Sequence, residues 1–186
     1  MTGKLFIVAT PIGNLNDITF RAVDVLKNVD IVLAEDTRHS KKLFTHFEIS
    51  TPIRAFHEHN ERDKNKAIID EIHSGKSIAL ISDAGTPLIS DPGYYLVAYA
   101  TKEGIDVTPI PGPSALITAL SASGLASDSF TFFGFLPSKQ TARVKFLQKL
   151  ISSTETIIFY ESPKRILATL TDMLSIFGGE REVCLA

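Results

Sequence analysis

The sequence predicts an α/β fold with a mostly parallel sheet. The 186 residues give room for one large domain or two small ones. Residues 5–9, 31–34 and 78–81 are short apolar runs that are continuous rather than alternating, which is typical of strands covered by helices on both faces. Longer amphipathic segments separate these runs, and the β-α-β-α order favours parallel strands joined by right-handed crossovers.

Weaker signals predict the other elements of the first part of the chain. Residues 105–110 form a further expected strand and residues 53–57 a weaker one. Helices are expected over residues 19–28, 37–47, 60–74, 92–103 and 113–123. Asn60, followed by Asp63 three residues later, indicates a helix start, and Gly75 indicates a helix stop. Pro92 and Pro113 suit the first turns of their helices.

A change in composition at residues 124–129 predicts a boundary between an N-terminal domain, 1–124, and a second domain, 125–186. The second domain has expected strands over 130–135 and 156–160, expected helices over 138–151 and 163–177, and a strand that begins at Glu182. Because the chain ends inside this last expected strand, the sequence predicts a fragment whose second α/β subdomain is truncated.

The composition narrows the class of protein. A chain that is 44% hydrophobic and 22% charged is neither disordered nor a disulfide framework. Cys184 is the single cysteine and fits a reducing cytosol, and no apolar run approaches the roughly 20 residues of a membrane span. We therefore expect a cytoplasmic protein without a membrane partner. The net charge of −2 argues against nucleic-acid binding by bulk charge but allows a local basic patch.

Loops rich in Gly, Pro and polar residues follow five of the expected strands. They are residues 10–14, 35–38, 82–87, 111–115 and 160–165. Ligands of open α/β sheets bind outside the carboxyl ends of the strands, so these loops predict one cleft. For any single loop the alternative is an ordinary short turn, which uses the same residue types. None of the loops carries the G-x-G-x-x-G fingerprint of dinucleotide binding.

Basic side chains lie beside two of these loops. A run at residues 38–42 and a pair at 164–165 are either solvated helix faces or contacts to the phosphates of a nucleic acid. The candidate RNA-binding residues are Arg38, His39, Lys41, Lys164 and Arg165. His57-Glu58-His59 lacks the spacing of a metal-binding motif, and we expect no metal.

Six motifs carry a resemblance to a known family. They are residues 8–15 (VATPIGNL), 34–38 (AEDTR), 82–87 (SDAGTP), 90–93 (SDPG), 111–115 (PGPSA) and 159–165 (FYESPKR). In this order, over nearly the whole chain, they resemble bacterial 16S ribosomal RNA 2'-O-ribose methyltransferases, a branch of the tetrapyrrole (corrin and porphyrin) methylase superfamily. The resemblance implies a homodimer that binds S-adenosylmethionine between two α/β domains. It also implies methylation of a cytidine ribose 2'-hydroxyl in the decoding centre of 16S rRNA, within the small ribosomal subunit.

The resemblance assigns cofactor contacts to residues in four of the loops. They are Pro11, Ile12, Gly13, Ser82, Asp83, Ala84, Gly85, Thr86, Ser114, Ala115, Tyr160 and Glu161. The transfer needs an in-line nucleophile, and a ribose hydroxyl benefits from a base or a positioned cation. The candidate catalytic residues are Glu35, Asp36 and Lys42, with His39 as a further titratable group. Only Glu35 falls where small-molecule methylases of the superfamily have an acid/base carboxylate.

Two alternatives stay open. A methylase acting on a tetrapyrrole would share the fold and cofactor but would need an apolar trough, which the basic run at residues 38–42 disfavours. A non-catalytic module would bind a ligand or RNA without turnover.

Overall fold

The structure is a computed structural model that describes residues 3–186, without the side chains of residues 58–64. The chain divides into two compact units, Met1–Ala115 and Leu116–Ala186. Helices alternate with parallel strands in both, so the predicted α/β class is confirmed. The domain ranges 1–124 and 125–186 stay a prediction.

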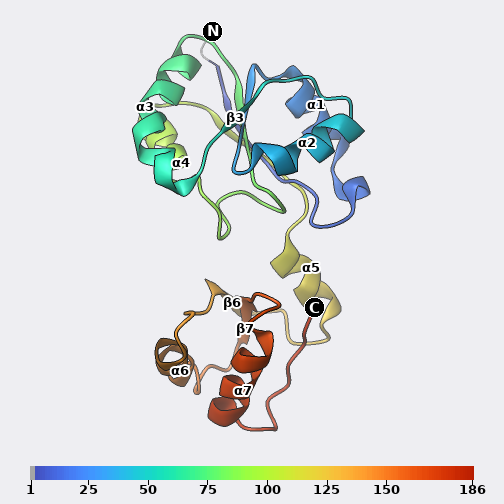
Figure 1. Ribbon diagram of the computed structural model, residues 1–186, viewed down its shortest axis with the longest axis vertical. Helices are drawn as coiled ribbons and strands as arrows, with labels where there is room; N and C mark the ends of the chain where they lie inside the picture. The colour runs from blue at the N-terminus through green and yellow to red at the C-terminus, as the bar shows by residue number, and fades with distance from the viewer. Residues whose placement is uncertain (1–2) are drawn as a thin grey trace. The chain divides into compact units, whose positions relative to one another are not determined.

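The first unit contains a five-stranded sheet and its covering helices (Figure 1). Its strands are β1 (Leu5–Val8), β2 (Ile31–Ala34), β3 (Ile53–Ala55), β4 (Ile78–Ile81) and β5 (Val107–Ile110). Its helices are the short 3-10 helix η1 (Leu15–Asp17), α1 (Phe20–Asn28), α2 (Thr37–His46), α3 (Glu58–His73) and α4 (Tyr94–Lys102). The strand order is β3-β2-β4-β1-β5, and every ladder is parallel. Leu5 of β1 pairs with Ile78 on one side and with Val107 on the other.

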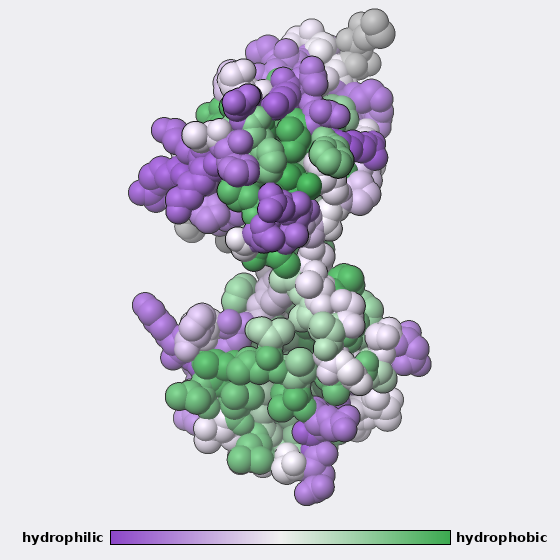
Figure 2. Space-filling view, turned by 90° about the vertical axis from the view of Figure 1, so that its right-hand side faces the viewer, coloured by the Kyte–Doolittle hydropathy of each residue, from purple (hydrophilic) through white to green (hydrophobic). Residues whose placement is uncertain are grey.

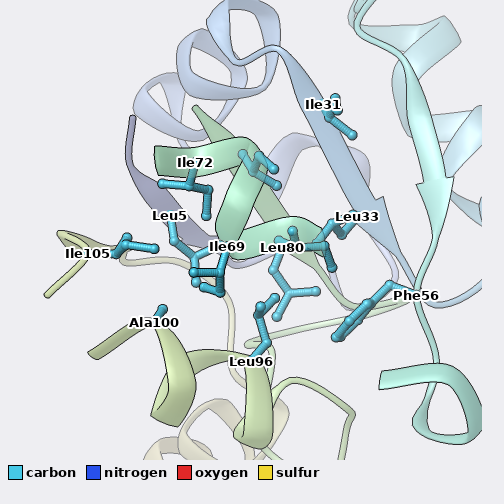
Figure 3. Close-up of a cluster of buried hydrophobic side chains, with 12 residues drawn as sticks. Leu5, Ile31, Leu33, Phe56, Ile69, Ile72, Leu80, Leu96, Ala100 and Ile105 are labelled. Atoms are coloured by element: carbon cyan, nitrogen blue, oxygen red, sulfur yellow. The ribbon is translucent and has the colours of Figure 1, made fainter. Parts of the chain in front are cut away.

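Two hydrophobic cores bury the two faces of this sheet. Helices α1 and α2 cover one face, and α3 and α4 cover the other (Figure 1). Figure 3 shows the core between the sheet and helices α3 and α4. Here Leu96 of α4 and Ile72 of α3 pack with three strand residues, Leu5, Leu33 and Leu80. Each of these five side chains is at most 1% exposed, and burying one contributes about 1.5–3 kcal/mol. The continuous apolar strands predicted from the sequence exist because both faces are buried.

Helix α4 begins later than its sequence predicts. Gly93 is the N-cap, with φ of 126°, and a Cβ built on it would lie 2.6 Å from Leu80 Cδ2. Close packing on β4 therefore requires glycine here and sets the start of the helix. Pro92 precedes the N-cap, so its predicted place in the first turn is wrong.

Two other helix starts also differ from prediction. Helix α5 (Ala115–Ala122) begins two residues after Pro113, so that proline is outside the first turn as well. Helix α3 begins at Glu58 rather than at Asn60. The side chains of Asn60 and Asp63 lie outside the described residues.

The second unit contains β6 (Phe130–Phe135), α6 (Gln140–Gln148), β7 (Thr156–Tyr160) and α7 (Ile166–Phe177), after most of α5. Strands β6 and β7 form a two-stranded parallel sheet, with an irregularity between Phe132 and Phe135. Phe132 also packs edge to face against Tyr160 across the ladder, at 4.8 Å between centroids. Parallel neighbours need a crossover, which α6 provides.

A buried ion pair joins helices α6 and α7 of this unit. The Arg143 guanidinium donates to Asp172 Oδ2, with Nε at 2.8 Å and Nη2 at 2.7 Å. Gln140 Nε2 donates to the other carboxylate oxygen at 2.9 Å. The Arg143 and Asp172 side chains are only 4% and 6% exposed, so each would be an uncompensated buried charge without its partner.

Residues 182–186 form no strand, and the expected strand at Glu182 is wrong. A strand needs a hydrogen-bonded neighbour, and the ladder of this unit joins only β6 and β7. Val183 and Leu185 are 68% and 67% exposed.

Figure 2 shows hydrophobic residues gathered on the surface of this unit. Among the described helices, none has the length and apolarity needed to cross a membrane.

Candidate functional site at the carboxyl edge of the sheet

The loops after β1 and β4 leave the sheet at its switch point. These strands are neighbours, yet α1, which follows β1, packs on one face and α4, which follows β4, packs on the other. The two connections diverge at the carboxyl ends of the strands, which is the place where open α/β sheets bind ligands.

Thr10 and Gly85 join these two loops through their backbones. Thr10 N–H donates to the Gly85 carbonyl at 2.9 Å, and Gly85 N–H donates back to the Thr10 carbonyl at 3.0 Å. Thr10 Oγ1 also donates to the Ser82 carbonyl at 3.1 Å, and Ser82 Oγ donates to the Gly85 carbonyl at the same distance. Both hydroxyls are buried. The side chains of Thr10 and Ser82 therefore stabilise the two loops.

Small residues allow the loops to approach each other closely. Gly85 has φ of +83°, and a Cβ there would lie 3.4 Å from Ile12 Cγ2. A Cβ on Gly112 would meet Ala9 Cβ at 2.9 Å. The missing side chains at these two positions therefore allow the loops to pack against each other.

Two side-chain bonds link the β4 loop to the loops after β2 and β5. Asp83 Oδ1 accepts from the Asp36 N–H at 3.1 Å, and Thr86 Oγ1 donates to the Pro113 carbonyl at 3.0 Å. The structure therefore brings together four of the five predicted loops. They hold the predicted residues Pro11, Ile12, Gly13, Glu35, Asp36, Ser82, Asp83, Ala84, Gly85, Thr86, Ser114 and Ala115.

Asp36 caps helix α2 and pairs with Arg38. Its Oδ1 accepts from the Arg38 N–H at 2.8 Å, and the carboxylate also accepts from Arg38 Nε at 3.1 Å and Nη2 at 2.8 Å. These hydrogen bonds hold the pKa of Asp36 far below its usual value. A carboxylate so strongly stabilised in its charged form is a weak proton acceptor.

Glu35 and the cations of α2 occupy different environments. Glu35 is half-buried between β2 and the Asp36 cap, whereas Arg38, His39, Lys41 and Lys42 are exposed. Positions 38, 41 and 42 share one face of the helix, because residues three and four apart are neighbours. The geometry therefore separates one sheltered carboxylate from a solvent-facing basic surface.

Asp91 belongs to this edge although the sequence assigned it no role. Burial raises its pKa, the nearby charge of Asp83 adds to the increase, and a hydrogen bond with Ser82 opposes it. Leu88 and Ser90, in the same loop, have φ of 72° and 66°, which side-chain-bearing residues rarely adopt. The SDPG motif at residues 90–93 was the available signal, but a motif does not reveal that its carboxyl group contacts Ser82.

In the second unit, Glu161 is bound by its own loop and by Thr169 of α7. Its Oε1 accepts from the Ser162 N–H and from Arg165 Nε, each at 2.7 Å, and its Oε2 accepts from Thr169 Oγ1 at 2.7 Å. Although burial opposes ionisation, the bonds from Thr169, the Ser162 N–H and Arg165 hold the pKa of Glu161 below its usual value. Its side chain is 6% exposed, so these contacts stabilise the loop after β7.

The other predicted residues of this loop differ in how they are bound. Tyr160 packs its ring against Phe132. Arg165 binds Glu161 and donates to the Leu136 carbonyl at 3.2 Å, while Lys164 is exposed. Of the two predicted cations, the structure leaves Lys164 as the one facing solvent.

Among the described residues, no group of three or more His, Cys, Asp or Glu side chains is arranged to hold a metal ion. The side chains of Glu58 and His59, from the His57-Glu58-His59 run, lie outside that description.

The first unit is thus a doubly wound α/β unit whose linked loops lie at the switch point of its parallel sheet. The model of the family "Tetrapyrrole (Corrin/Porphyrin) Methylases" matches residues 4–186. The chain therefore belongs to this family, which confirms the resemblance found in the sequence.

Proteins with similar sequences are named as methyltransferases. The chain is 60% identical over 182 residues to "Ribosomal RNA small subunit methyltransferase I" of Vibrio cholerae, covering 98% of the chain and 63% of the relative. It is 57% identical over 184 residues to the protein of that name from Pseudomonas aeruginosa, covering 99% and 65%. The chain thus spans less than two thirds of the length of these relatives. A solved structure of diphthine synthase shares the fold, with a TM-score of 0.72 and 16% identity over 93% of the chain and 71% of that structure.

Proposed function

We propose that the chain is part of an S-adenosylmethionine-dependent methyltransferase that modifies a cytidine ribose 2'-hydroxyl in the decoding centre of 16S rRNA. The observation that carries this proposal is the 60% identity to a relative named as a small-subunit rRNA methyltransferase. The four linked loops at the carboxyl edge support it, because they offer a site for a small ligand where α/β sheets bind one.

The residues at this edge fit S-adenosylmethionine. The cofactor has a zwitterionic amino-acid part and a ribose, which need polar groups at close range. Gly85 and Gly112 let the loops pack closely together, and Asp83 supplies a carboxylate oriented by the Asp36 N–H. We assign the cofactor contacts of the first unit to residues 11–13, 82–86 and 114–115, while the contacts expected of Tyr160 and Glu161 stay predictions. When bound, S-adenosylmethionine supplies an activated methyl group.

Glu35 is the residue that we assign to accept the proton of the ribose hydroxyl. It lies at the end of β2, beside the loops that we assign to the cofactor. Asp36 is a poorer base because Arg38 and the start of α2 stabilise its charged form. Lys42 is exposed one helical turn beyond Arg38, where a cation can hold a phosphate.

The basic face of α2 would bind the RNA backbone. We assign phosphate contacts to Arg38, His39 and Lys41 on α2 and to Lys164 in the second unit, which are all exposed. Arg165 contributes indirectly, because it already binds Glu161 and the Leu136 carbonyl. The partner would be the 16S rRNA of the small ribosomal subunit, in the cytoplasm, with the enzyme acting as a homodimer.

The test is the transfer of radiolabel from S-adenosylmethionine to three acceptors: small-subunit RNA, a porphyrinogen, and neither. Label in RNA, recovered as 2'-O-methylcytidine after digestion, is the expected result. Label in the porphyrinogen would instead show a tetrapyrrole methylase. Cofactor binding without transfer to either acceptor would show a non-catalytic module.

A further inference from the structure

We propose that Tyr94, braced by Tyr95, stacks on an unpaired base of the RNA substrate next to the methylated ribose. This inference rests on the proposed function. Tyr94 and Tyr95 are the first two residues of α4 and are 67% and 43% exposed. Tyrosine is enriched at interfaces, because its ring is apolar while its hydroxyl is polar.

The pair lies beside the candidate cofactor site. Gly93 packs on Leu80 of β4, which fixes the start of α4 at the carboxyl end of that strand. Leu80 is two residues before Ser82, a span of at most about 7 Å, and Gly93 directly precedes Tyr94. A ribose placed at the Ser82 loop would therefore have its own base, or the next one, within reach of the Tyr94 ring.

The geometry of the two rings suits stacking. Their centroids are 5.3 Å apart and their planes are inclined at 69°, so the edge of one ring faces the other. This arrangement restrains the orientation of Tyr94 while most of its ring stays exposed. Unstacked RNA bases are commonly bound on such exposed aromatic rings.

The charges of the neighbouring helix favour RNA as the occupant. Arg38, Lys41 and Lys42 are exposed on α2, which begins at the same edge of the sheet, and phosphates would complement them. A planar tetrapyrrole could also stack on tyrosine, so the experiment includes it as a competing ligand.

The test measures affinity for an RNA hairpin that contains the target cytidine, with an abasic nucleotide introduced at each loop position in turn. Tyr94→Ala and Tyr94→Leu should bind the intact hairpin about 5- to 100-fold more weakly, the range that one base–aromatic stack contributes. Tyr94→Trp should retain affinity. One abasic position should weaken the wild type by a similar factor and leave Tyr94→Ala unchanged. Phe130→Ala is the control and should bind like the wild type, because Phe130 is an exposed aromatic residue at the start of β6, at the amino end of the second sheet.

Three results would overturn the inference. One is undiminished RNA affinity of Tyr94→Ala in a protein whose wild type methylates RNA. Another is that, at every abasic position, the loss of RNA affinity in Tyr94→Ala is as large as in the wild type. A third is a loss of porphyrinogen affinity rather than RNA affinity in this variant. If instead the wild type transfers methyl groups only to a porphyrinogen, the proposed function itself is wrong.

Discussion

Thr10 and Gly85 exchange two backbone hydrogen bonds, at 2.9 and 3.0 Å, between loops that are 75 positions apart in the chain. The pair joins the two loops at the switch point of the sheet. Since Gly85 has φ of +83°, its backbone conformation and its lack of a side chain are both needed at this place.

We expect Gly85→Ala to weaken binding of S-adenosylmethionine at least tenfold in calorimetry. The new methyl group would contact Ile12, and the left-handed conformation costs an L-residue about 1–2 kcal/mol. Gly104→Ala is the control, because Gly104 has φ of +71° but no atom within 4 Å of the added Cβ. Both variants should melt at a lower temperature, and only Gly85→Ala should lose cofactor affinity. Equal cofactor affinity of the two variants would place the site elsewhere.

Glu35→Gln should lower the rate of methyl transfer by about 10²–10⁴-fold, the usual contribution of a general base. Cofactor and RNA affinities should stay close to those of the wild type. Asp36→Asn should have a much smaller effect on the rate, because Asp36 caps α2 and is a poor base. Single-turnover kinetics with saturating cofactor would measure both rates. A larger loss in Asp36→Asn than in Glu35→Gln would reverse the assignment.

Reversing charge on α2 should weaken RNA binding in a salt-dependent way. For Lys41→Glu with Lys42→Glu, the slope of log affinity against log salt should fall by about one for each phosphate that the variant no longer binds. Cofactor affinity should not change. Lys27→Glu with Lys102→Glu alters net charge equally, but these lysines lie in the last turns of α1 and α4, away from the carboxyl edge. If this control lowered the slope as much, the binding would depend on net charge alone.

The second unit should lose stability in acid through Asp172 and Glu161. The hydrogen bond from Gln140 lowers the pKa of Asp172, with Arg143 adding to the effect, and the pKa of Glu161 is lowered as well. A carboxyl group whose pKa is lowered by folding stabilises the fold at any pH above its ordinary pKa. That ordinary pKa is 3.8 for Asp172 and 4.5 for Glu161. That stabilisation is lost as the pH falls through the lowered values.

Calorimetric melting between pH 7 and pH 2 would follow this loss. Asp172→Asn should be less stable at neutral pH and show a flatter decline in acid. Arg143→Ala should cost about 3–5 kcal/mol at pH 7, because it leaves a buried carboxylate unpaired. A decline in Asp172→Asn as steep as in the wild type would show that Asp172 does not contribute to the acid transition.

The sequence predicted the sheet well because burial on both faces produces an unmistakable apolar pattern, as in β2 and β4. It failed where tertiary contacts decide. The start of α4 depends on the packing of Gly93 against Leu80, which no local pattern encodes. The expected strand at Glu182 has the right residue types but no hydrogen-bonded neighbour.

The candidate site was predictable to the level of its loops. The motifs and the strand order place four loops at one edge of the sheet. They do not predict the hydrogen bond from the Asp36 N–H to Asp83. They also cannot show that Glu161 is bound by its own loop and by Thr169 of α7, or that burial raises the pKa of Asp91. Such pairings depend on side-chain directions, which are set only after the core has packed.

The most direct test of the central claim is to locate bound S-adenosylmethionine by ultraviolet crosslinking and peptide mapping. The labelled cofactor should attach to peptides that contain residues 11–13, 82–86 or 112–115, and excess unlabelled cofactor should abolish the labelling. Saturable labelling confined to peptides outside these loops, for example within residues 140–151, would contradict a cofactor site at the carboxyl edge of the sheet.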